Sequence, residues 1–433
     1  MSKSKVGTNL NERTRIITKF PFLEDKNLWD KIVIDEMNKK IVGEIESREI
    51  IFLCGIGRLV KNSAYSSFNL LIHSESSAGK DYTMKNVLKI FPDDYVFSRT
   101  RISPTVLNYW KPYKKLGQDT WNGCILYLPD IGDSILNSDA LKLMCSDGSH
   151  ITITDKGQAI DIEIKGKPVV FSTTANSTPN EEILNRFSIV HLDESENQTK
   201  KIMKMQAERA IEGLSCDYNE DIKSALMYLK SYNVKIPFAG MIAEVFPTAI
   251  IKQRRNFERF LDFIKAITIF YQFQRNIEGD TLIAEWEDYD RARDIFMNIE
   301  KGLSTIPLNT KQKQIINVLR KNEDGLALSE IHGKMEKYIS LQNMRPHLES
   351  LCNLRVLDKF YGKDSLSREI IKYKLSEEYI NFKPIKLPLS QELNEKIDSN
   401  NGIYNISNNN NNGGSEISQH AGKKGGVTTY HRY

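Results

Sequence analysis

A string of small and charged residues between a predicted strand and a predicted helix carries the clearest chemistry in this sequence. Residues 74–81 read Ser-Glu-Ser-Ser-Ala-Gly-Lys-Asp, after an apolar run at 68–72 and before a helical pattern over 82–90. Backbone N–H groups of such a loop wrap phosphates, its lysine reaches the β- and γ-phosphate oxygens, and the helix N-terminus favours negative charge. The string therefore predicts a nucleoside triphosphate site, lined by Ser74, Ser76, Ser77, Ala78, Gly79, Lys80, Asp81 and Tyr82.

The loop departs from the pattern G-x-x-x-x-G-K-[ST] at two positions. Ser74 replaces the first glycine, and Asp81 replaces the hydroxyl residue that normally contacts Mg²⁺. A carboxylate is also a hard oxygen ligand, so we expect Asp81 to hold the ion directly or through water, with Thr83 a poorer substitute. An ordinary turn followed by a helix start is the alternative interpretation.

A second segment offers another carboxylate. The apolar run at 124–128 ends in Pro129 and Asp130, and Asp133 follows. In hydrolytic P-loop proteins such a strand end supplies one acid to the magnesium shell and a neighbouring acid that orients the attacking water. Since Pro129 occupies one of these places, Asp130 acts alone or shares the work with Asp81 and Asp133. The predicted metal ligands are Asp81 and Asp130, and a buried strand ending in a Pro-Asp turn is the alternative.

Two later segments can contact the γ-phosphate. The apolar strand pattern at 168–173 ends in Thr-Ala-Asn, and we expect Asn176, or failing that Thr174, to hydrogen-bond the phosphate and the attacking water. Arg186 precedes the next strand pattern, where a guanidinium at a subunit edge can stabilise charge on a neighbour's phosphate. The alternatives are a plain strand exit and a surface ion pair.

The order of these segments, followed by Arg255-Asn-Phe-Glu in a long helical pattern, resembles the AAA+ module of minichromosome maintenance (MCM) helicases. It is closer to the MCM-like ATPase domains attached to primases of plasmids, viruses and other mobile elements. The resemblance covers roughly residues 30–275. It implies a homo-oligomeric ring, expected to be a hexamer, in which Arg186 serves the neighbouring subunit and Arg255 is sensor 2. The expected catalytic set is Lys80, Asp130, Asn176 and Arg255 from one chain, completed by Arg186 from the next.

The resemblance also gives a role to residues 146–164. Two alternating segments flank Asp155-Lys156-Gly157, which predicts a β-hairpin. MCM-type rings project such hairpins into the central channel, so Lys156 is expected to contact a phosphate of a DNA strand there. A surface hairpin without a ligand is the alternative.

Residues 309–380 predict a separate unit. Three helical patterns (310–321, 329–337, 341–354) precede two strand patterns (356–361, 369–375), which is typical of a winged helix. Residues 311–374 hold thirteen Lys or Arg and eight Asp or Glu. Arg345 on the third helix and Lys363 on the wing are the predicted contacts to duplex DNA, while a protein-docking module is the alternative.

Strand-like runs at 68–72, 95–98, 124–128, 151–154, 160–164, 169–173 and 189–192 alternate with helical patterns. This predicts an α/β fold with a parallel sheet and a nucleotide at the carboxyl ends of its strands. The expected organisation is a mobile N-terminal segment (1–27), the AAA+ core (28–196), a helical lid region (197–305), the winged helix (306–382) and a disordered tail (383–433).

Length and composition set wider bounds. The 433 residues are 40% apolar and 27% charged, as in globular proteins of two or three domains. A net charge of +4 permits nucleic-acid binding without requiring it. Five scattered cysteines without a C-x-x-C pair indicate reduced core residues. With no apolar N-terminal stretch and no twenty-residue apolar run, we expect a cytoplasmic protein without a membrane partner.

These observations together predict an ATP- and Mg²⁺-dependent DNA helicase or translocase acting in replication, with a primase or polymerase as a further partner. The sequence shows no recognisable primase or oligonucleotide-binding domain. Two alternatives stay open: an ATP-binding replication initiator or scaffold with little hydrolysis, and a winged-helix regulator that oligomerises through its AAA+ part.

Overall fold

The structure is a computed structural model of the whole chain. It describes residues 3–64, 66–74, 79–112, 120–146, 149–174, 179–213, 217–248, 253–303, 308, 310–335, 339–363, 367–381 and 385–395. Residues 1–387 form one compact unit, which contains every element named below. Within the described ranges, no helix combines the length and apolar character needed to cross a lipid bilayer.

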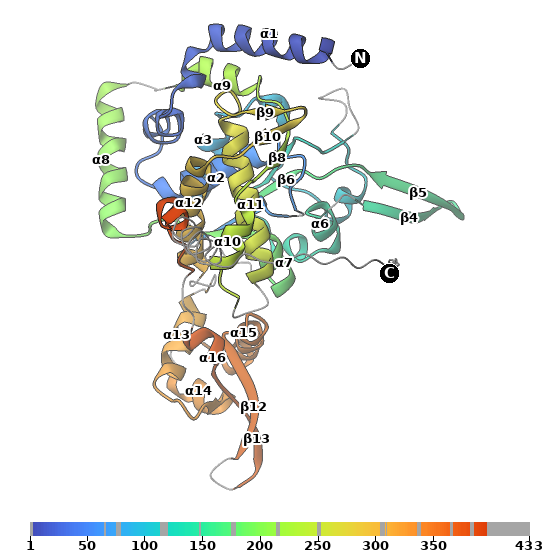
Figure 1. Cartoon of the computed structure of the whole chain (residues 1–433). Coiled ribbons are helices and arrows are strands. Elements are labelled where there is room, and N and C mark those ends of the chain that lie inside the picture. The colour runs from blue at the N-terminus through green and yellow to red at the C-terminus, as the bar shows by residue number, and fades with distance from the viewer. Residues whose placement is uncertain are drawn as a thin grey trace, which may run out of the picture. The chain divides into compact units, whose positions relative to one another are not determined.

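A five-stranded parallel sheet forms the centre of the fold (Figure 1), in the spatial order β2-β3-β6-β1-β7. Every residue of β1, β3 and β6 is buried, as expected when helices cover both faces of a parallel sheet. The predicted parallel α/β arrangement is therefore confirmed. The strands are β1 Leu70–His73, β2 Val96–Ser98, β3 Ile125–Leu128, β6 Val169–Thr174 and β7 Ser188–Val190.

The two faces of this sheet have different coverings. On one face, Leu71, Leu126, Val170 and Ile189 share a core cluster with Trp121 and with side chains of three short helices, α5 Asp133–Leu136, α6 Asp139–Met144 and α7 Glu181–Arg186. α2 Ile45–Gly57 contacts β6 and packs against α3 Lys80–Leu88 and α11 Gln253–Phe270. Burial on both sides fixes the strand ends, and with them the loops that carry the candidate site.

The N-terminal segment differs from the mobile region expected over 1–27. It contains the helix α1 Lys3–Lys19 and a 3₁₀ turn Pro21–Glu24. Ile16, Phe20 and Leu23 are buried, with 6%, 2% and 1% exposure. The Phe20 ring packs against that of Tyr228, with centroids 5.7 Å apart, and such distant contacts anchor the segment. The expectation missed them because they join residues far apart in the sequence.

Residues 197–303 are mostly helical, as predicted, but they also contain a small sheet that the pattern did not indicate. Its order is β8-β10-β9, and β9 pairs with β10 in antiparallel fashion across Gly279 and Asp280. The strands have only two or three residues, too few for an alternating pattern to show. The elements are α8 Glu196–Glu212, α9 Glu220–Leu226, β8 Asn233–Lys235, α10 Ala239–Val245, α11, β9 Ile277–Glu278, β10 Thr281–Ile283 and α12 Trp286–Leu303.

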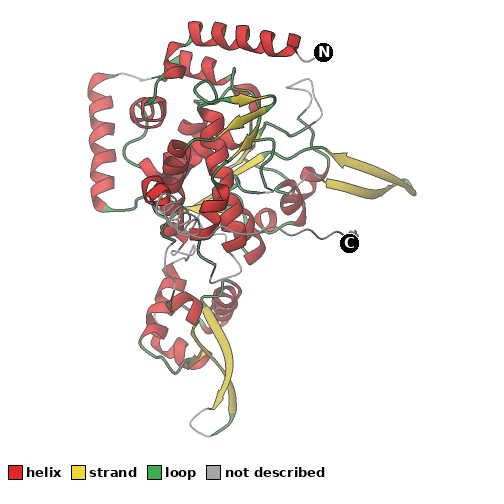
Figure 2. Cartoon of the chain, in the orientation of Figure 1, coloured by secondary structure: helices red, strands yellow, loops and turns green. Residues whose placement is uncertain are grey.

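A two-stranded hairpin, β4 Ser149–Asp155 and β5 Gln158–Ile164, extends away from the central sheet (Figure 2). The predicted hairpin is thus confirmed. Asp155 pairs with Gln158, so Lys156 and Gly157 alone form the turn. Both have positive φ, 49° and 79°, as a two-residue type I′ turn requires. This geometry favours glycine at the second position and places Lys156 at the tip.

Residues 310–381 contain α13 Thr310–Arg320, β11 Leu326–Ala327, α14 Leu328–Met335, α15 Leu341–Asn353, β12 Leu357–Lys363, β13 Glu369–Leu375 and α16 Glu377–Ile380. Three helices surround a core with Val356 and Tyr373, and the strands form an antiparallel sheet in the order β11-β13-β12. A disordered tail was expected to begin at residue 383. The apolar side chains of Ile385 and Leu387 are instead buried, with 4% and 3% exposure. Residues 396–433 of that expected tail lie outside the described ranges.

One buried ion pair gives a test of this architecture. The Arg275 guanidinium donates to Asp288 at 2.6 Å, and the Asp288 side chain is fully buried and also accepts from Thr268. Asp288→Ala removes this partner, leaves buried Arg275 with the partly exposed Glu285 at 3.3 Å, and should lower the free energy of unfolding by about 3 kcal/mol. The control Asp280→Ala breaks the exposed pair with Lys61 and should cost about 1 kcal/mol or less. Equal urea midpoints for the two variants would contradict this packing.

Candidate nucleotide site

The predicted phosphate loop joins the end of β1 to the start of α3. Because β1 ends at His73 and α3 begins at Lys80, the loop lies at the carboxyl edge of the sheet. Gly79 caps the helix with φ of 85°, a conformation that side chains disfavour. The Lys80 ammonium donates to the backbone oxygen of Ser74 at 2.9 Å, and Lys80 is 8% exposed. The Lys80 side chain therefore reaches back from the start of α3 to the residue that follows β1.

Not every predicted loop residue can be located. Ser76, Ser77 and Ala78 lie outside the described residues. Ser74 is buried, and its hydroxyl donates to Glu194 at 2.9 Å. The Tyr82 hydroxyl donates to the backbone oxygen of Lys40 at 2.7 Å and accepts from Arg209 at 2.9 Å. Tyr82 thus ties α3 to α8, and its hydroxyl is used away from the loop.

Asp81 points across the carboxyl edge of the sheet. One of its oxygens, Oδ1, accepts a hydrogen bond from the Tyr127 hydroxyl of β3 at 3.0 Å and another from the Thr173 hydroxyl of β6 at 2.7 Å. Burial, and then the charge of Asp81, raises the pKa of the Tyr127 phenol, so this hydroxyl keeps its proton and remains a donor. The carboxylate that replaces the usual hydroxyl is therefore held by two strands.

The order of the strands also places Asp130 at this edge of the sheet. Because β6 lies between β1 and β3, its tip separates the loop from Asp130. The Asp130 backbone N–H donates to the Thr173 hydroxyl at 2.8 Å, and Asp130 is exposed with φ of 46°. Thr174 is buried with 1% exposure, and Asn176 lies outside the described residues. Thr173 therefore links Asp81 and Asp130, a role that the sequence did not indicate.

The carboxylates at this edge of the sheet fit a magnesium ion that is bound together with a nucleotide. Among the described residues there is no cluster of three or more His, Cys, Asp or Glu able to hold a metal alone. Mg²⁺ in nucleotide sites keeps several waters and takes one or two carboxylates plus phosphate oxygens. Asp81 and Asp130 carry such carboxylates at one edge of the sheet, where Thr173 contacts the Asp81 carboxylate and the backbone N–H of Asp130. Exposed Asp133, at the start of α5, is a third acid nearby in sequence.

The two predicted arginines lie elsewhere. Arg186 is the last residue of α7, just before Ser188, which pairs with Leu70 at the start of β1. It is thus at the amino edge of the sheet, while Lys80 follows the carboxyl end of the same strand. With a rise of about 3.3 Å per residue, the length of β1 alone separates the two edges by roughly 10 Å.

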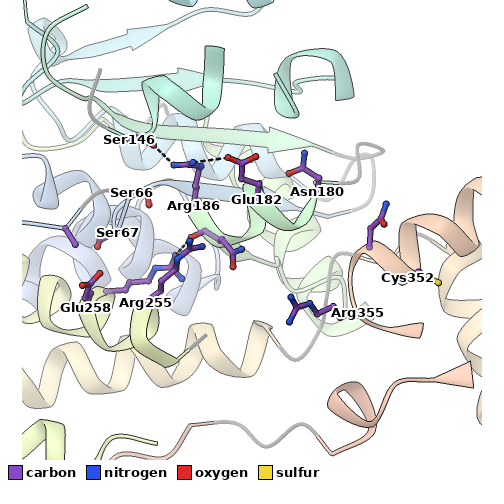
Figure 3. A pocket seen from close by; sticks show the side chains of 14 residues that line it. Ser66, Ser67, Ser146, Asn180, Glu182, Arg186, Arg255, Glu258, Cys352 and Arg355 are labelled. Atoms are coloured by element: carbon purple, nitrogen blue, oxygen red, sulfur yellow. Dashed lines mark hydrogen bonds and ion pairs between the residues drawn. The ribbon is translucent and has the colours of Figure 1, made fainter. Parts of the chain in front are cut away.

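Arg255 shares this amino-edge region with Arg186 (Figure 3). Both line one cavity, together with Ser66, Ser146 and Glu258. One turn along α11 from Arg255, Arg259 donates to the backbone oxygen of Asn185 at 3.4 Å, which places the start of α11 beside α7. In this structure α11 begins at the opposite edge of the sheet from Lys80, so Arg255 does not lie beside the loop of its own chain, and its role as sensor 2 stays a prediction.

Arg186 is held by its own chain in this arrangement. It donates to Glu182 at 2.9 Å and to the Ser146 hydroxyl, and Glu182 also pairs with Lys142 at 2.9 Å. The Arg186 Nε atom is buried and has no hydrogen-bond partner in the described part of the chain. Arg186 is therefore held by its contacts with Glu182 and Ser146.

A family model described as the MTBMA_p00010 P-loop domain matches residues 20–228. The matched range includes β1, the loop with Lys80, β3 and β6. Residues 20–228 are therefore similar to a P-loop domain, which together with the parallel sheet fits an α/β P-loop fold and supports nucleotide binding. The description of this family names no helicase. No curated protein sequence matches the chain.

The burial of His73, at the end of β1 beside the loop, can be tested through the pH dependence of stability. Burial, followed by the nearby His191 and Lys80, lowers the pKa of His73 to about 4. The unfolded chain takes up this proton near pH 6.5, so stability is lost as pH falls from about 6.5 to 4. We expect His73→Gln to remove about 3 kcal/mol of this pH dependence in urea unfolding. Measuring the difference between wild type and variant cancels other groups, such as Glu44, whose pKa burial raises to about 7. Parallel pH profiles would contradict the assignment.

Proposed function

We propose that the protein is an ATP-dependent DNA translocase of the MCM-like AAA+ class, which works as a ring in the replication of a mobile element or virus. The observation that carries the proposal is the separation of Lys80 and Arg186 to opposite edges of one sheet. A phosphate site built from both can form only between two copies of the chain. Head-to-tail contacts of this kind close into rings when the rotation between subunits permits.

In the proposed site, Lys80 neutralises the β- and γ-phosphates while Asp81 and Asp130 hold the ion that accompanies them. Bound Mg²⁺ would supply charge neutralisation on the phosphates. Arg186 of the next subunit exchanges its contact with Glu182 for the γ-phosphate and stabilises charge in the transition state. Arg255, which lines the same cavity, acts beside it from that subunit. Asn176 is proposed to orient the attacking water.

DNA contact is proposed at the hairpin tip and in the C-terminal unit. Lys156 lies at the turn of a projecting hairpin, where it can reach a backbone phosphate of a single strand. The three helices and small sheet of residues 310–381 have the element order of a winged helix. In this unit Arg345 on α15 and Lys363 at the end of β12 are both exposed, as contacts to duplex DNA require.

Mixing two inactive variants tests the shared site. Lys80→Ala and Arg186→Ala should each abolish DNA-stimulated ATPase activity, which we expect to exceed about 1 s⁻¹ in the wild type. In a 1:1 mixture, about a quarter of interfaces (one half times one half) recover both groups, so activity should return to roughly that fraction. The double variant mixed with Arg186→Ala rebuilds no interface and is the control. A mixture as inactive as this control would contradict the shared site.

Salt dependence tests the hairpin. Lys156→Ala should weaken single-stranded DNA binding and reduce the slope of log affinity against log salt by about 0.7 for each phosphate that the lysine neutralises in the wild type. Lys200→Ala is the control, because Lys200 is a similarly exposed lysine on α8. Titrations at several salt concentrations give both slopes. An unchanged slope for Lys156→Ala would remove this hairpin from the DNA path.

A second candidate function is an ATP-binding initiator or scaffold with little hydrolysis. It is favoured by Pro129, which leaves Asp130 as the single acid directly at the end of β3. Oligomerisation that depends on ATP, with a turnover that single-stranded DNA does not stimulate, would favour this candidate over the motor.

A further inference from the structure

The contact between Tyr127 and Asp81 is the most unusual feature of the proposed site, and neither residue's partner follows from the P-loop pattern. Tyr127 is 1% exposed within β3, yet its hydroxyl reaches the first turn of α3. Thr173 is fully buried at the end of β6 and donates to the same carboxylate oxygen. Two buried hydroxyls therefore converge on one oxygen of a single carboxylate.

This arrangement leaves the second oxygen of Asp81 open. Oδ1 accepts both hydrogen bonds, while Oδ2 has no partner among the described residues. Two donors at 2.7 and 3.0 Å hold the carboxylate in one orientation. Asp81 directly follows Lys80 in the first turn of α3, so its carboxylate is carried by the same turn as the predicted phosphate-binding lysine.

We propose that Tyr127 and Thr173 are positioning residues that hold Asp81 as a magnesium ligand, and that this makes nucleotide binding dependent on the metal. The inference rests on the proposed nucleotide site. In the usual P-loop the corresponding group is a neutral hydroxyl, which does not repel a metal-free triphosphate. A fixed carboxylate at this position repels the phosphate charges unless a divalent cation lies between them.

The structure also indicates why a tyrosine is used at position 127. Asp81 is partly buried, and hydrogen-bond donors offset the hydration that a carboxylate loses on burial. A phenol hydroxyl donates a hydrogen bond, and the ring spans the distance from the β3 backbone to α3. Tyr127→Phe removes only the donor and preserves the ring, which makes it the informative substitution.

The first experiment measures binding of a fluorescent ATP analogue to the full chain, in excess Mg²⁺ and in EDTA. Wild type should bind at least about 100-fold more tightly with Mg²⁺. Asp81→Ser restores the neutral hydroxyl and should reduce this ratio to about tenfold or less, mainly through tighter binding in EDTA. A wild-type ratio near one, or an Asp81→Ser protein with the wild-type ratio, would overturn the inference.

The second experiment titrates Mg²⁺ at a fixed concentration of the analogue. Tyr127→Phe and Thr173→Val should each raise the half-saturating Mg²⁺ concentration by about tenfold, while affinity at saturating Mg²⁺ changes by about twofold or less. Tyr271→Phe is the matched control, because this tyrosine is also buried and its hydroxyl contacts Lys26 and Trp29 instead. Melting curves of all variants detect misfolding. We expect Tyr127→Phe and Tyr271→Phe to have similar melting temperatures, so that a difference in Mg²⁺ dependence reports on the site.

The outcomes separate this inference from the proposed function. A Tyr127→Phe protein that folds and follows the wild-type Mg²⁺ curve would overturn the positioning role while leaving the nucleotide site intact. A wild-type chain that binds no analogue at any Mg²⁺ concentration would contradict the nucleotide site itself.

Discussion

The parallel pairing of β1 with β6 and β7 is the constraint on which the rest of the structure depends. It fixes where the chain leaves the sheet: the Lys80 loop at the carboxyl edge and the Arg186 turn at the amino edge. Side chains on both faces of these strands are buried, so a shift of the register would expose apolar surface. The chemical groups are therefore positioned by hydrophobic burial more than by polar contacts among themselves.

The position of β6 between β1 and β3 has a second consequence. The Thr173 hydroxyl at the tip of β6 contacts both Asp81 and the backbone of Asp130, so one short polar chain connects α3 to the end of β3. Such buried chains are stable only if every member is satisfied. The loss of any one hydroxyl should therefore disturb the others, and the candidate site behaves as a unit more than as a set of independent ligands.

The sequence predicted much of this fold because its signals are local. Apolar runs located the strands of the sheet within about two residues, and the Gly-Lys pair located the start of α3. The hairpin around Lys156 followed from alternation and a two-residue turn. By contrast, Tyr127 and Asp81 are 46 positions apart, and their contact depends on the order of the strands, which no local pattern contains. Arg255 was assigned to its own site for the same reason, and the two- and three-residue strands β8–β10 were too short to recognise.

Equilibrium binding of ATP to the full chain tests the central claim most directly. Isothermal titration in excess Mg²⁺ should show one ATP bound per chain for wild type, and binding weakened by at least about 100-fold for Lys80→Met. Lys85→Met, an exposed lysine one turn further along α3, should bind as wild type does. Wild-type affinity in the Lys80→Met protein would show that the triphosphate, if it binds at all, is held elsewhere, and it would contradict the assignment of the loop between β1 and α3 as the nucleotide site.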